Sequence, residues 1–447
     1  MPILPIDTGR YGTPEMLKVF QEEARIQKLL DVEAALAWAH AEVGNIPKLD
    51  AEKIKLMAST KYVKVERVKA IEKEIKHDIA SLVRALSEQC GSSGSYVHLG
   101  STSYDIVDTA NALQLKDASQ IIENRLIELR SILQQKAGLY KDTVMMGRTH
   151  GQHALPITLG FKFAVWGYEV NRHIQRIRQS RERVIAGKIS GAVGSQAGLG
   201  EHAIKIQELV MKKLNITAAE ISTQIVQRDR YAELISILSL IVTSLDNFSV
   251  EIRELARPEI SELFESFEAE KQVGSSTMPH KRNPETCERI CGLARIVRGL
   301  SIPALEDMVT WHERDLTQSS TERFLLPQSC ILTDYLISLM INIISNLRID
   351  PQRMLKNIDI TQGRTMSESV MMALTHKSVN RQEAHELLRK LTIKSELGKR
   401  HFKQILQEDQ FVTSKLTEKE IDIALNPNNY LGTTIKQAET FANKNFS

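Results

Sequence analysis

Cysteine is scarce in this chain of 447 residues, which holds only Cys90, Cys287, Cys291 and Cys330. Four cysteines are too few for a disulfide framework in a chain of this length, and no CxxC pair occurs. Cys287 and Cys291 are four residues apart, which places them on one face of a helix, so packed thiols are favoured over a metal site. HExxH and paired Cys/His patterns are also missing. We therefore expect neither a bound metal nor another cofactor.

An excess of charge of either sign is also missing. The chain has 58 basic and 55 acidic side chains, which gives a net charge of +3. This balance argues against nucleic acid or an anionic membrane as a partner, so an anion site would have to be a local cluster of cations. The N-terminal MPILPIDTGRYGTPEM lacks the basic and apolar regions of a signal peptide. We expect a cytoplasmic protein.

Proline and glycine are absent over long stretches. No proline lies between Pro47 and Pro156, and no glycine lies between Gly100 and Gly138. Such stretches, filled with Leu, Ile, Ala, Glu, Lys and Gln, predict long helices. One of them is expected over residues 106–140, where about 35 residues would span about 50 Å. That length exceeds the needs of a compact domain and indicates a bundle or an oligomer that shares helices.

Two further segments, 231–256 and 329–347, are apolar on nearly all sides. A membrane span is the alternative, but polar residues such as Asp246 and Asp334 interrupt both segments, so buried bundle helices are favoured. No strand pattern of any length is apparent. The sequence therefore predicts an all-α protein with an N-terminal helical domain over 1–95, a central bundle of long helices over 96–348 and a C-terminal helical domain over 349–447.

Polar chemistry concentrates in four islands rich in glycine or proline, over 91–105, 147–156, 187–200 and 274–284. The last island reads GSSTMPHKRNP, in which Pro279 and Pro284 stiffen a run of donors that includes Lys281. A serine hydroxyl that removes a proton, beside fixed donors that stabilise the resulting anion, would suit this composition. A polar loop between helices, with a turn stiffened by proline, is the alternative.

Three other segments carry candidate residues. In GRTHGQHALP the flanking glycines predict an irregular backbone that presents His150 to a cleft, or else a histidine satisfied within a turn. In EIKHDIASL the KHD triplet, residues 76–78, ends a charged helix face. In WHERDLTQSSTER two arginines, Arg314 and Arg323, flank a pair of serines. Charge runs of this kind are usually solvated helix faces.

GSSTMPHKRNP resembles the signature loop of the aspartase/fumarase superfamily, whose general form is GSSxMPxKxNP. The resemblance extends over nearly the whole chain and, within the superfamily, is to the adenylosuccinate lyases. It rests on RYGTPEM, KHD, HLGSTSYDIVDTA, GRTHGQHALP, KISGAVGS, STQIVQRDR and WHERDLTQSSTERFLLP. It implies an enzyme that splits a C–N bond by β-elimination and releases fumarate, from adenylosuccinate and from the succinylated aminoimidazole carboxamide ribotide of purine synthesis.

The same resemblance implies roles in proton transfer. Ser275 would be the base, and His150 would protonate the departing nitrogen. Glu288 would orient His150, and His77 would support the site.

The resemblance also implies how the anionic substrate is held. Lys281 and Asn283 would stabilise the aci-carboxylate intermediate, and Ser276 would help to bind the carboxylate. The other substrate-binding positions would be Arg10, Tyr11, Lys76, Asp78, Thr102, Ser103, Gln224, Arg314, Ser319 and Arg323. A phosphate and two carboxylates on the substrate would explain a local cluster of cations in a nearly neutral chain.

Family members are homotetramers in which three chains contribute to each active site, so the resemblance implies a shared central bundle. Two alternatives stay open. One is a sister enzyme of the carboxymuconate cycloisomerase or argininosuccinate lyase type, which would share the loop. The other is a helical structural protein that has lost catalysis, although such a protein should show gaps in the set formed by Ser275, His150, Lys281, Asn283 and Glu288.

Overall fold

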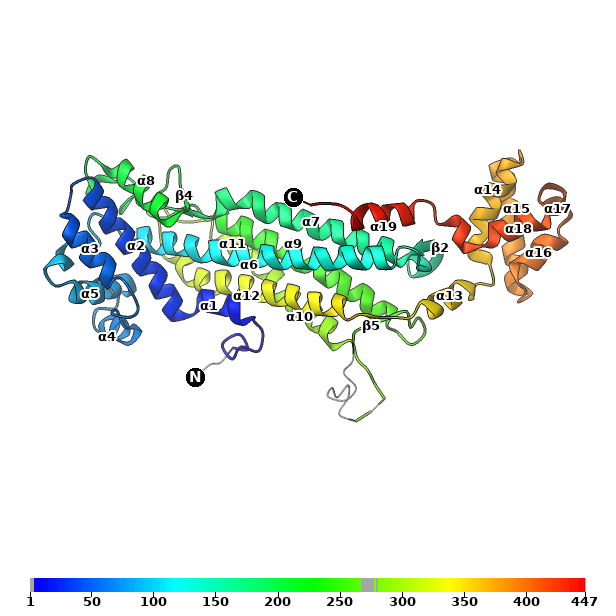
Figure 1. Cartoon of the computed structure of the whole chain (residues 1–447), viewed down its shortest axis with the longest axis horizontal. Helices are drawn as coiled ribbons and strands as arrows, with labels where there is room; N and C mark the ends of the chain where they lie inside the picture. Colours follow the sequence, from blue (N-terminus) through cyan, green and yellow to red (C-terminus); the bar gives the residue numbers. More distant parts are fainter. Residues whose placement is uncertain (1–3, 267–276, 279, 447) are drawn as a thin grey trace. The chain divides into compact units, whose positions relative to one another are not determined.

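The computed structural model describes residues 4–266, 277–278 and 280–446. Helices account for most of this part of the chain (Figure 1). The helices are α1 Pro14–Phe20, α2 Glu22–Glu42, α3 Lys48–Met57, α4 Val65–Ile75, α5 Asp78–Cys90, α6 Ser103–Leu139, α7 Leu159–Val184, α8 Ala203–Leu214, α9 Asp229–Leu255, α10 Glu285–Gly299, α11 Ser301–Glu306, α12 Thr317–Ser345, α13 Pro351–Asp359, α14 Ser367–His376, α15 Arg381–Leu397, α16 Phe402–Glu408, α17 Gln410–Lys415, α18 Glu418–Leu425 and α19 Thr434–Ala442. The strands are β1 Val144–Thr149, β2 Gln152–Thr158, β3 Ala186–Gly187, β4 Thr217–Ala218, β5 Leu263–Phe264 and β6 Arg348–Ile349.

The predicted all-α class is confirmed, and the long helices follow the stretches without glycine or proline. The helix expected over 106–140 is α6, which has 37 residues. Leu126, Leu129 and Leu133 of α6 are at most 1% exposed, as their spacing of three and four residues predicts for one buried helix face. All four cysteines are buried, in agreement with packed thiols.

The chain forms two compact units, each assembled from segments that are distant in sequence. The first unit takes residues up to 127, then 172–246 and 290–339. Its hydrophobic core joins α2 to α5 with α8 and the start of α6, through buried side chains such as Leu36, Ile71, Leu86, Ile106 and Ile206. Figure 1 shows α2, α3, α4 and α5 grouped together in blue.

The second unit takes the described residues of 128–171, 247–289 and 340–446. Aromatic rings fill part of its core, where Trp166 of α7 stacks on Phe248 of α9 with 4.8 Å between ring centroids. Phe163 meets Trp166 edge-on at 5.8 Å. A separate cluster with Phe402 and Ile421 holds α14 to α18 together, and Figure 1 shows these helices as one orange-to-red group.

A β-hairpin departs from the expectation that strands would be absent. Strands β1 and β2 pair antiparallel, with Thr149 opposite Gln152, so His150 and Gly151 form a two-residue turn. Both turn residues have positive φ, 53° and 73°, as a type I′ hairpin turn requires. Burial does not alternate along β1, whose first three residues are all buried, so the sequence shows no strand pattern there. The irregular backbone expected around His150 is this tight turn.

Helices α9 and α12 are long and apolar enough to cross a membrane by length and composition alone. In the most apolar windows of these helices, 56% and 61% of the residues are buried inside the protein, as in core helices. Asp334, within α12, accepts a hydrogen bond from the Thr13 hydroxyl and lies 3.6 Å from Arg125 Nε. Thr13 and Arg125 are therefore the polar partners that allow the Asp334 carboxylate to lie in the middle of the apolar helix α12.

Gly167 of α7 leaves room for the ring of Phe441 in α19. A Cβ atom at position 167 would lie 1.9 Å from Phe441 Cζ, which is far inside van der Waals contact. Alanine favours a helix over glycine by about 1 kcal/mol, but the clash requires movement of the ring or of α19. We expect Gly167→Ala to lower the free energy of unfolding by about 1–3 kcal/mol in urea titrations.

Phe441→Leu is the matched second-site change, because a smaller side chain gives the new methyl group room. The double variant should be less destabilised than the sum of the two single variants. A Gly167→Ala protein at least as stable as the wild type would contradict this account of the α7–α19 contact.

Candidate active site

The KHD triplet lies at the junction between α4 and α5 and is not part of a continuous charged helix face. Lys76 ends α4 with a left-handed backbone (φ 57°), and the next residue, His77, is the N-cap of α5. The His77 Nδ1 atom accepts a hydrogen bond from the Ala80 amide at 3.2 Å. This bond assigns the proton of a neutral ring to Nε2, which leaves an N–H donor for another group.

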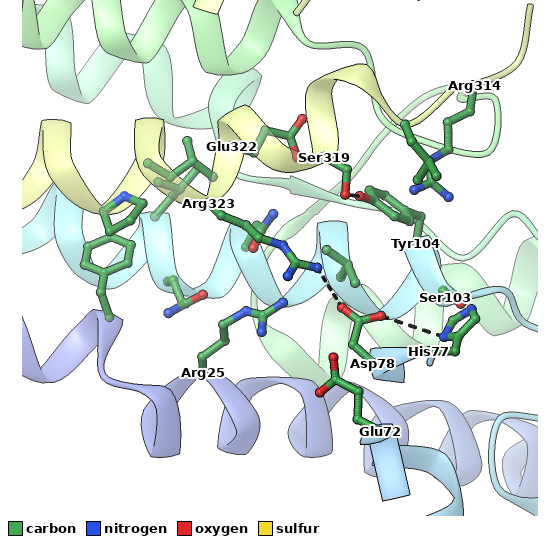
Figure 2. Close-up of a pocket in the computed structure, with 18 of the residues that line it drawn as sticks. Arg25, Glu72, His77, Asp78, Ser103, Tyr104, Arg314, Ser319, Glu322 and Arg323 are labelled. Atoms are coloured by element: carbon green, nitrogen blue, oxygen red, sulfur yellow. Dashed lines mark hydrogen bonds and ion pairs between the residues drawn. The ribbon is translucent and has the colours of Figure 1, made fainter. Parts of the chain in front are cut away.

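A cavity of about 540 Å³ opens beside this junction, within the first unit. Its size is within the range of small-molecule sites. Seven residues expected from the sequence line it, and they come from the KHD junction, the start of α6 and the segment 314–323: Lys76, His77, Asp78, Ser103, Arg314, Ser319 and Arg323. All of them except Lys76 are labelled in Figure 2. Residues that are far apart in the chain therefore meet around one space.

Cations dominate one wall of the cavity. Arg323 Nη2 donates to Asp78 Oδ2 at 2.9 Å, which links α12 to the KHD junction. Arg25 of α2 also lines the cavity, and Figure 2 shows its guanidinium near that of Arg323. Burial, and then the charge of Arg323, lowers the pKa of Arg25. The guanidinium groups of Arg25 and Arg323 can therefore donate hydrogen bonds to an anionic ligand in the cavity.

A second wall is organised around Tyr104. The Arg314 guanidinium carbon lies 3.6 Å from the centroid of the Tyr104 ring, a cation–π contact. Arg314 Nη1 donates to Gln224 Oε1 at 2.8 Å, and the Tyr104 hydroxyl donates to Ser319 Oγ at 2.8 Å. Burial raises the pKa of Tyr104, so the phenol stays protonated and remains a donor. Two residues predicted from the sequence, Arg314 and Ser319, are thus held by a tyrosine that was not predicted, and Arg314 in turn holds Gln224.

A buried charge cluster lies directly behind the cavity. Arg228 is 3% exposed and makes two hydrogen bonds of 2.9 Å to Asp108. Its Nε and Nη2 atoms also donate to Glu322, a cavity residue, at 2.5 and 3.1 Å. Two carboxylates share one guanidinium away from water. Burial raises the pKa of Glu322 to about 7, because the loss of hydration outweighs the attraction of Arg228.

Arg10, Tyr11 and Thr102 do not line this cavity. Arg10 lies over the Tyr11 ring at 5.6 Å, and Tyr11 in turn is 6.0 Å from the ring of Tyr335. The Thr102 amide donates to Asp105 Oδ2 at 2.8 Å, just before α6 begins. The backbone thus places Thr102 next to Ser103, which does line the cavity.

The remaining described candidates belong to the second unit. His150 is exposed at the tip of the β1–β2 hairpin. The strand that leads to it is anchored by Arg148, which donates to both carboxylate oxygens of Glu262 at 3.0 and 2.6 Å. Glu262 is fully buried and also accepts from Asn357 Nδ2 at 2.7 Å. The histidine is therefore presented by a hairpin with a rigid base.

Lys281, Asn283 and Glu288 flank the start of α10, where Lys281 and Glu288 are exposed. Glu265 accepts from the amides of Thr286 and Cys287 at 3.1 and 2.6 Å and thereby caps α10. Within the described residues no hydrogen bond joins Glu288 to His150. Ser275 and Ser276 lie outside the described residues. Among the residues that are described, no group of three or more His, Cys, Asp or Glu side chains could hold a metal ion.

Comparison with known proteins settles the family. The sequence model of a family described as Lyase matches residues 9–299, and that of the adenylosuccinate lyase C-terminus matches residues 363–441. The adenylosuccinate lyase of Pyrococcus horikoshii is 51% identical over 432 residues, which cover 97% of this chain and 95% of that protein. The chain belongs to the adenylosuccinate lyase family. The adenylosuccinate lyase of Methanocaldococcus jannaschii is 47% identical, with 97% of this chain and 94% of that protein covered.

Solved structures of related enzymes share the fold. A fumarate lyase from Mesorhizobium sp. BNC1 superposes with a TM-score of 0.89 at 30% identity, covering 97% of this chain and 98% of that one. A 3-carboxy-cis,cis-muconate lactonizing enzyme from Pseudomonas putida gives 0.89 at 33% identity and covers 98% of each chain. Identities of 47–51% to adenylosuccinate lyases exceed these values and favour them over the sister enzyme. This member of the adenylosuccinate lyase family is therefore an enzyme, a lyase of purine biosynthesis.

Sequence reasoning missed several residues of the cavity of this lyase, chiefly Arg25, Glu72, Tyr104, Asn111, Gln114 and Glu322. One signal was available, because Tyr104, Asn111 and Gln114 recur on one face of α6 at spacings of seven and three. Polar side chains on an otherwise buried helix face indicate a site. Arg25 gave no signal, because it resembles any charged residue of an amphipathic helix.

The raised pKa of Glu322 predicts a pH dependence of stability. An unperturbed glutamate titrates near 4.5, so the folded protein binds this proton more tightly than the unfolded chain does. The contribution of Glu322 to stability is complete below about pH 4.5 and is lost as the pH rises through about 7. Glu322→Gln removes this titration.

We compare the free energy of unfolding of Glu322→Gln with that of the wild type at each pH. The difference, variant minus wild type, should rise by on the order of 3 kcal/mol from pH 5 to pH 8, because only the wild type loses the contribution of Glu322 over this range. Urea titrations at several pH values would measure the difference. A difference that does not change with pH would show that Glu322 remains ionised throughout.

Proposed function

We propose that the cavity of the first unit binds the nucleotide end of adenylosuccinate, which the enzyme splits into AMP and fumarate. The observation that carries this proposal is the convergence of Lys76, His77, Asp78, Ser103, Arg314, Ser319 and Arg323 around one space. Arginine guanidinium groups are well matched to phosphate and carboxylate oxygens. A second substrate of the same chemistry would be the succinylated aminoimidazole carboxamide ribotide, which also carries a phosphate and a succinyl group.

In the proposed reaction the C–N bond of the succinyl group breaks by β-elimination. Ser275, as its alkoxide, takes a proton from the carbon next to a carboxylate and becomes a hydroxyl, and the electrons of that C–H bond first form an aci-carboxylate. These electrons then form the double bond of fumarate as the C–N bond breaks and the nitrogen accepts a proton from His150. Glu288 orients His150. Each step conserves protons and electrons and uses side chains of the enzyme alone.

The main barrier is the charge of the aci-carboxylate intermediate. Lys281 and Asn283, together with Ser276, are proposed to hold this anion, and one preorganised donor of this kind contributes about 3 kcal/mol. The flanking prolines and the Glu265 cap on α10 support a fixed position for the donors after Met278. The Nε2–H donor of His77 would support the substrate from the cavity side.

The remaining substrate-binding proposals concern residues near the cavity. Gln224 is held by Arg314, and Thr102 precedes Ser103, so both would contact the substrate next to residues that line the cavity. Arg10 and Tyr11 are proposed phosphate-binding residues on the resemblance alone. Arg25 joins them as an additional cation, since it faces the same space.

We further propose that the enzyme is a cytoplasmic homotetramer of chains with three helical domains over 1–95, 96–348 and 349–447. The segment from α11 to the start of α12 supports self-association through exposed apolar side chains, namely Ile302, Leu305, Met308, Val309, Trp311, Leu316 and Phe324. Trp311 and Val309 are each 76% exposed in the single chain. Apolar surface of this extent marks a protein interface, and a second copy of the chain is the proposed occupant.

The function is tested by an ultraviolet absorbance assay of the purified enzyme with adenylosuccinate. We expect fumarate release in step with adenylosuccinate loss, and a kcat lowered by about 10²-fold or more in Ser275→Ala, because the base is removed. The same enzyme offered 3-carboxy-cis,cis-muconate should show no turnover. An intact wild-type enzyme that leaves adenylosuccinate unchanged would overturn the assignment.

Shared active sites are tested by mixing two inactive variants, His150→Gln and Ser275→Ala. If these residues come from different chains, hybrid tetramers contain some sites with both native residues. We expect recovery of about a tenth or more of wild-type activity after subunit exchange. Exchange between two differently tagged samples of one variant is the control and should stay inactive. Native mass spectrometry would show whether hybrid tetramers form. Hybrid tetramers that form but remain inactive would refute the proposal that His150 and Ser275 of one site come from different chains.

A further inference from the structure

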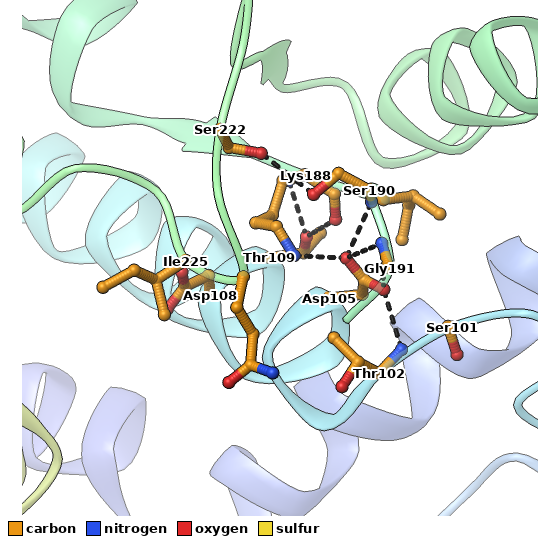
Figure 3. Close-up of polar contacts among 12 residues, drawn as sticks. Ser101, Thr102, Asp105, Asp108, Thr109, Lys188, Ser190, Gly191, Ser222 and Ile225 are labelled. Atoms are coloured by element: carbon orange, nitrogen blue, oxygen red, sulfur yellow. Dashed lines mark hydrogen bonds and ion pairs between the residues drawn. The ribbon is translucent and has the colours of Figure 1, made fainter. Parts of the chain in front are cut away.

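Asp105 is a fully buried carboxylate near the start of α6, and it accepts hydrogen bonds from two separate segments (Figure 3). Its Oδ2 atom accepts from the Thr102 amide at 2.8 Å and from the Gly191 amide at 3.0 Å. Its Oδ1 atom accepts from the Ser190 amide at 2.8 Å. One side chain therefore ties the turn before α6 to the loop after β3.

Lys188 supplies the opposite charge. Its ammonium group donates to Asp105 Oδ1, and neither side chain is exposed to solvent. The Lys188 backbone is held in turn by Thr109, whose hydroxyl donates to the Lys188 carbonyl at 2.9 Å and accepts from its amide at 3.1 Å. A buried carboxylate needs such a partner, because the loss of hydration of an unpaired charge is strongly unfavourable.

The same two segments also touch through their backbones. A Cβ atom at Gly100 would lie 2.5 Å from the carbonyl oxygen of Gly198, so these residues approach as only glycines can. Gly100 and Gly191 both have positive φ, 69° and 76°. The position of residues 100–103 is therefore set by the loop 188–198 through both backbone contact and the Asp105 carboxylate.

The contacts continue from this loop to Arg314. The Ser190 hydroxyl contacts Ser222 Oγ at 2.9 Å and donates to the Thr223 carbonyl at 3.1 Å. Gln224 Nε2 donates to the Ala192 carbonyl at 2.8 Å and therefore cannot rotate freely. The other end of the Gln224 amide accepts from Arg314, which stacks on Tyr104, the residue that precedes Asp105. The contacts thus form a closed ring of segments.

We propose that Asp105 and Lys188 are positioning residues for substrate binding, which set the placement of Thr102, Ser103, Gln224 and Arg314 without touching substrate themselves. This inference rests on the proposed function, because those four residues are its substrate-binding candidates. Of these four residues, Ser103 and Arg314 line the cavity, together with Tyr104, on which Arg314 stacks. Asp105 and Lys188 lie behind it, and their effect on the substrate is indirect.

Asp105→Asn tests the proposal with almost no change in shape. The amide keeps only one acceptor oxygen. With this oxygen in the place of Oδ2 its NH₂ group faces the Ser190 amide, and with the oxygen in the place of Oδ1 its NH₂ group faces the Thr102 amide, so one backbone donor is opposed in either orientation. We expect KM for adenylosuccinate to rise about tenfold or more at a temperature well below the melting transition. We also expect faster hydrogen–deuterium exchange in peptides that cover 100–105 and 188–192, measured by mass spectrometry.

The double variant Asp105→Asn/Lys188→Met separates positioning from stability. Removing both charges relieves the unpaired ammonium group, so the melting temperature should recover relative to Asp105→Asn. KM and the exchange rates should remain raised, because the NH₂ group of the amide still faces a backbone donor that the carboxylate accepted from. A double variant that regains wild-type KM together with stability would overturn the proposal.

Glu123→Gln is the matched control. Glu123 is also a buried carboxylate of α6, paired with Arg178 at 2.7 Å and with Arg181, but it lies about 27 Å further along the helix. We expect it to lower the melting temperature and leave KM and the exchange of 100–105 unchanged. Exchange that is equal in Asp105→Asn and Glu123→Gln would refute the proposal, even if wild-type enzyme did not act on adenylosuccinate. If the wild-type enzyme does not act on adenylosuccinate, but Asp105→Asn still shows faster exchange over 100–105 than Glu123→Gln does, only the proposed function is refuted.

Discussion

The first unit depends on two buried carboxylates one turn apart in α6. Asp105 and Asp108 are both inaccessible to solvent, and a buried carboxylate is tolerated only where cations and amide donors replace its hydration. Lys188 and Arg228 supply the charge, and the amides of Ser190 and Val226 lie 2.8 Å from Asp105 Oδ1 and Asp108 Oδ2. The loop segments that carry these donors must therefore lie against α6, and this requirement places the polar wall of the cavity.

The cavity combines this rigid wall with a charged and less constrained one. Arg323 pairs with the half-buried carboxylate of Asp78, and Arg25 faces the same space from α2. An anionic ligand that enters can replace Asp78 as a partner of these guanidinium groups, whereas the donors around Tyr104 are already oriented. If the cavity binds substrate as proposed, the residues around Tyr104 would orient it and Arg25 and Arg323 would hold its anionic groups.

The sequence was sufficient for the long helices but not for the contacts between them. Stretches without glycine or proline predicted α6, and the candidate site residues came from the resemblance of several motifs, GSSTMPHKRNP and KHD among them, to those of a known family. The β1–β2 hairpin was missed because burial does not alternate along β1, the strand that leads to the turn at His150. Arg25 and Glu322 were missed because their place in the cavity depends on tertiary packing, which no local pattern encodes.

The central claim is that the nucleotide end of the substrate occupies the cavity between the KHD junction and α12. The most direct measurement is a crystal structure of the Ser275→Ala variant soaked with adenylosuccinate. The account predicts density for the nucleotide against Ser103, Arg314 and Arg323, with the salt bridge between Arg323 and Asp78 altered. A nucleotide bound elsewhere, with this cavity unchanged, would contradict it.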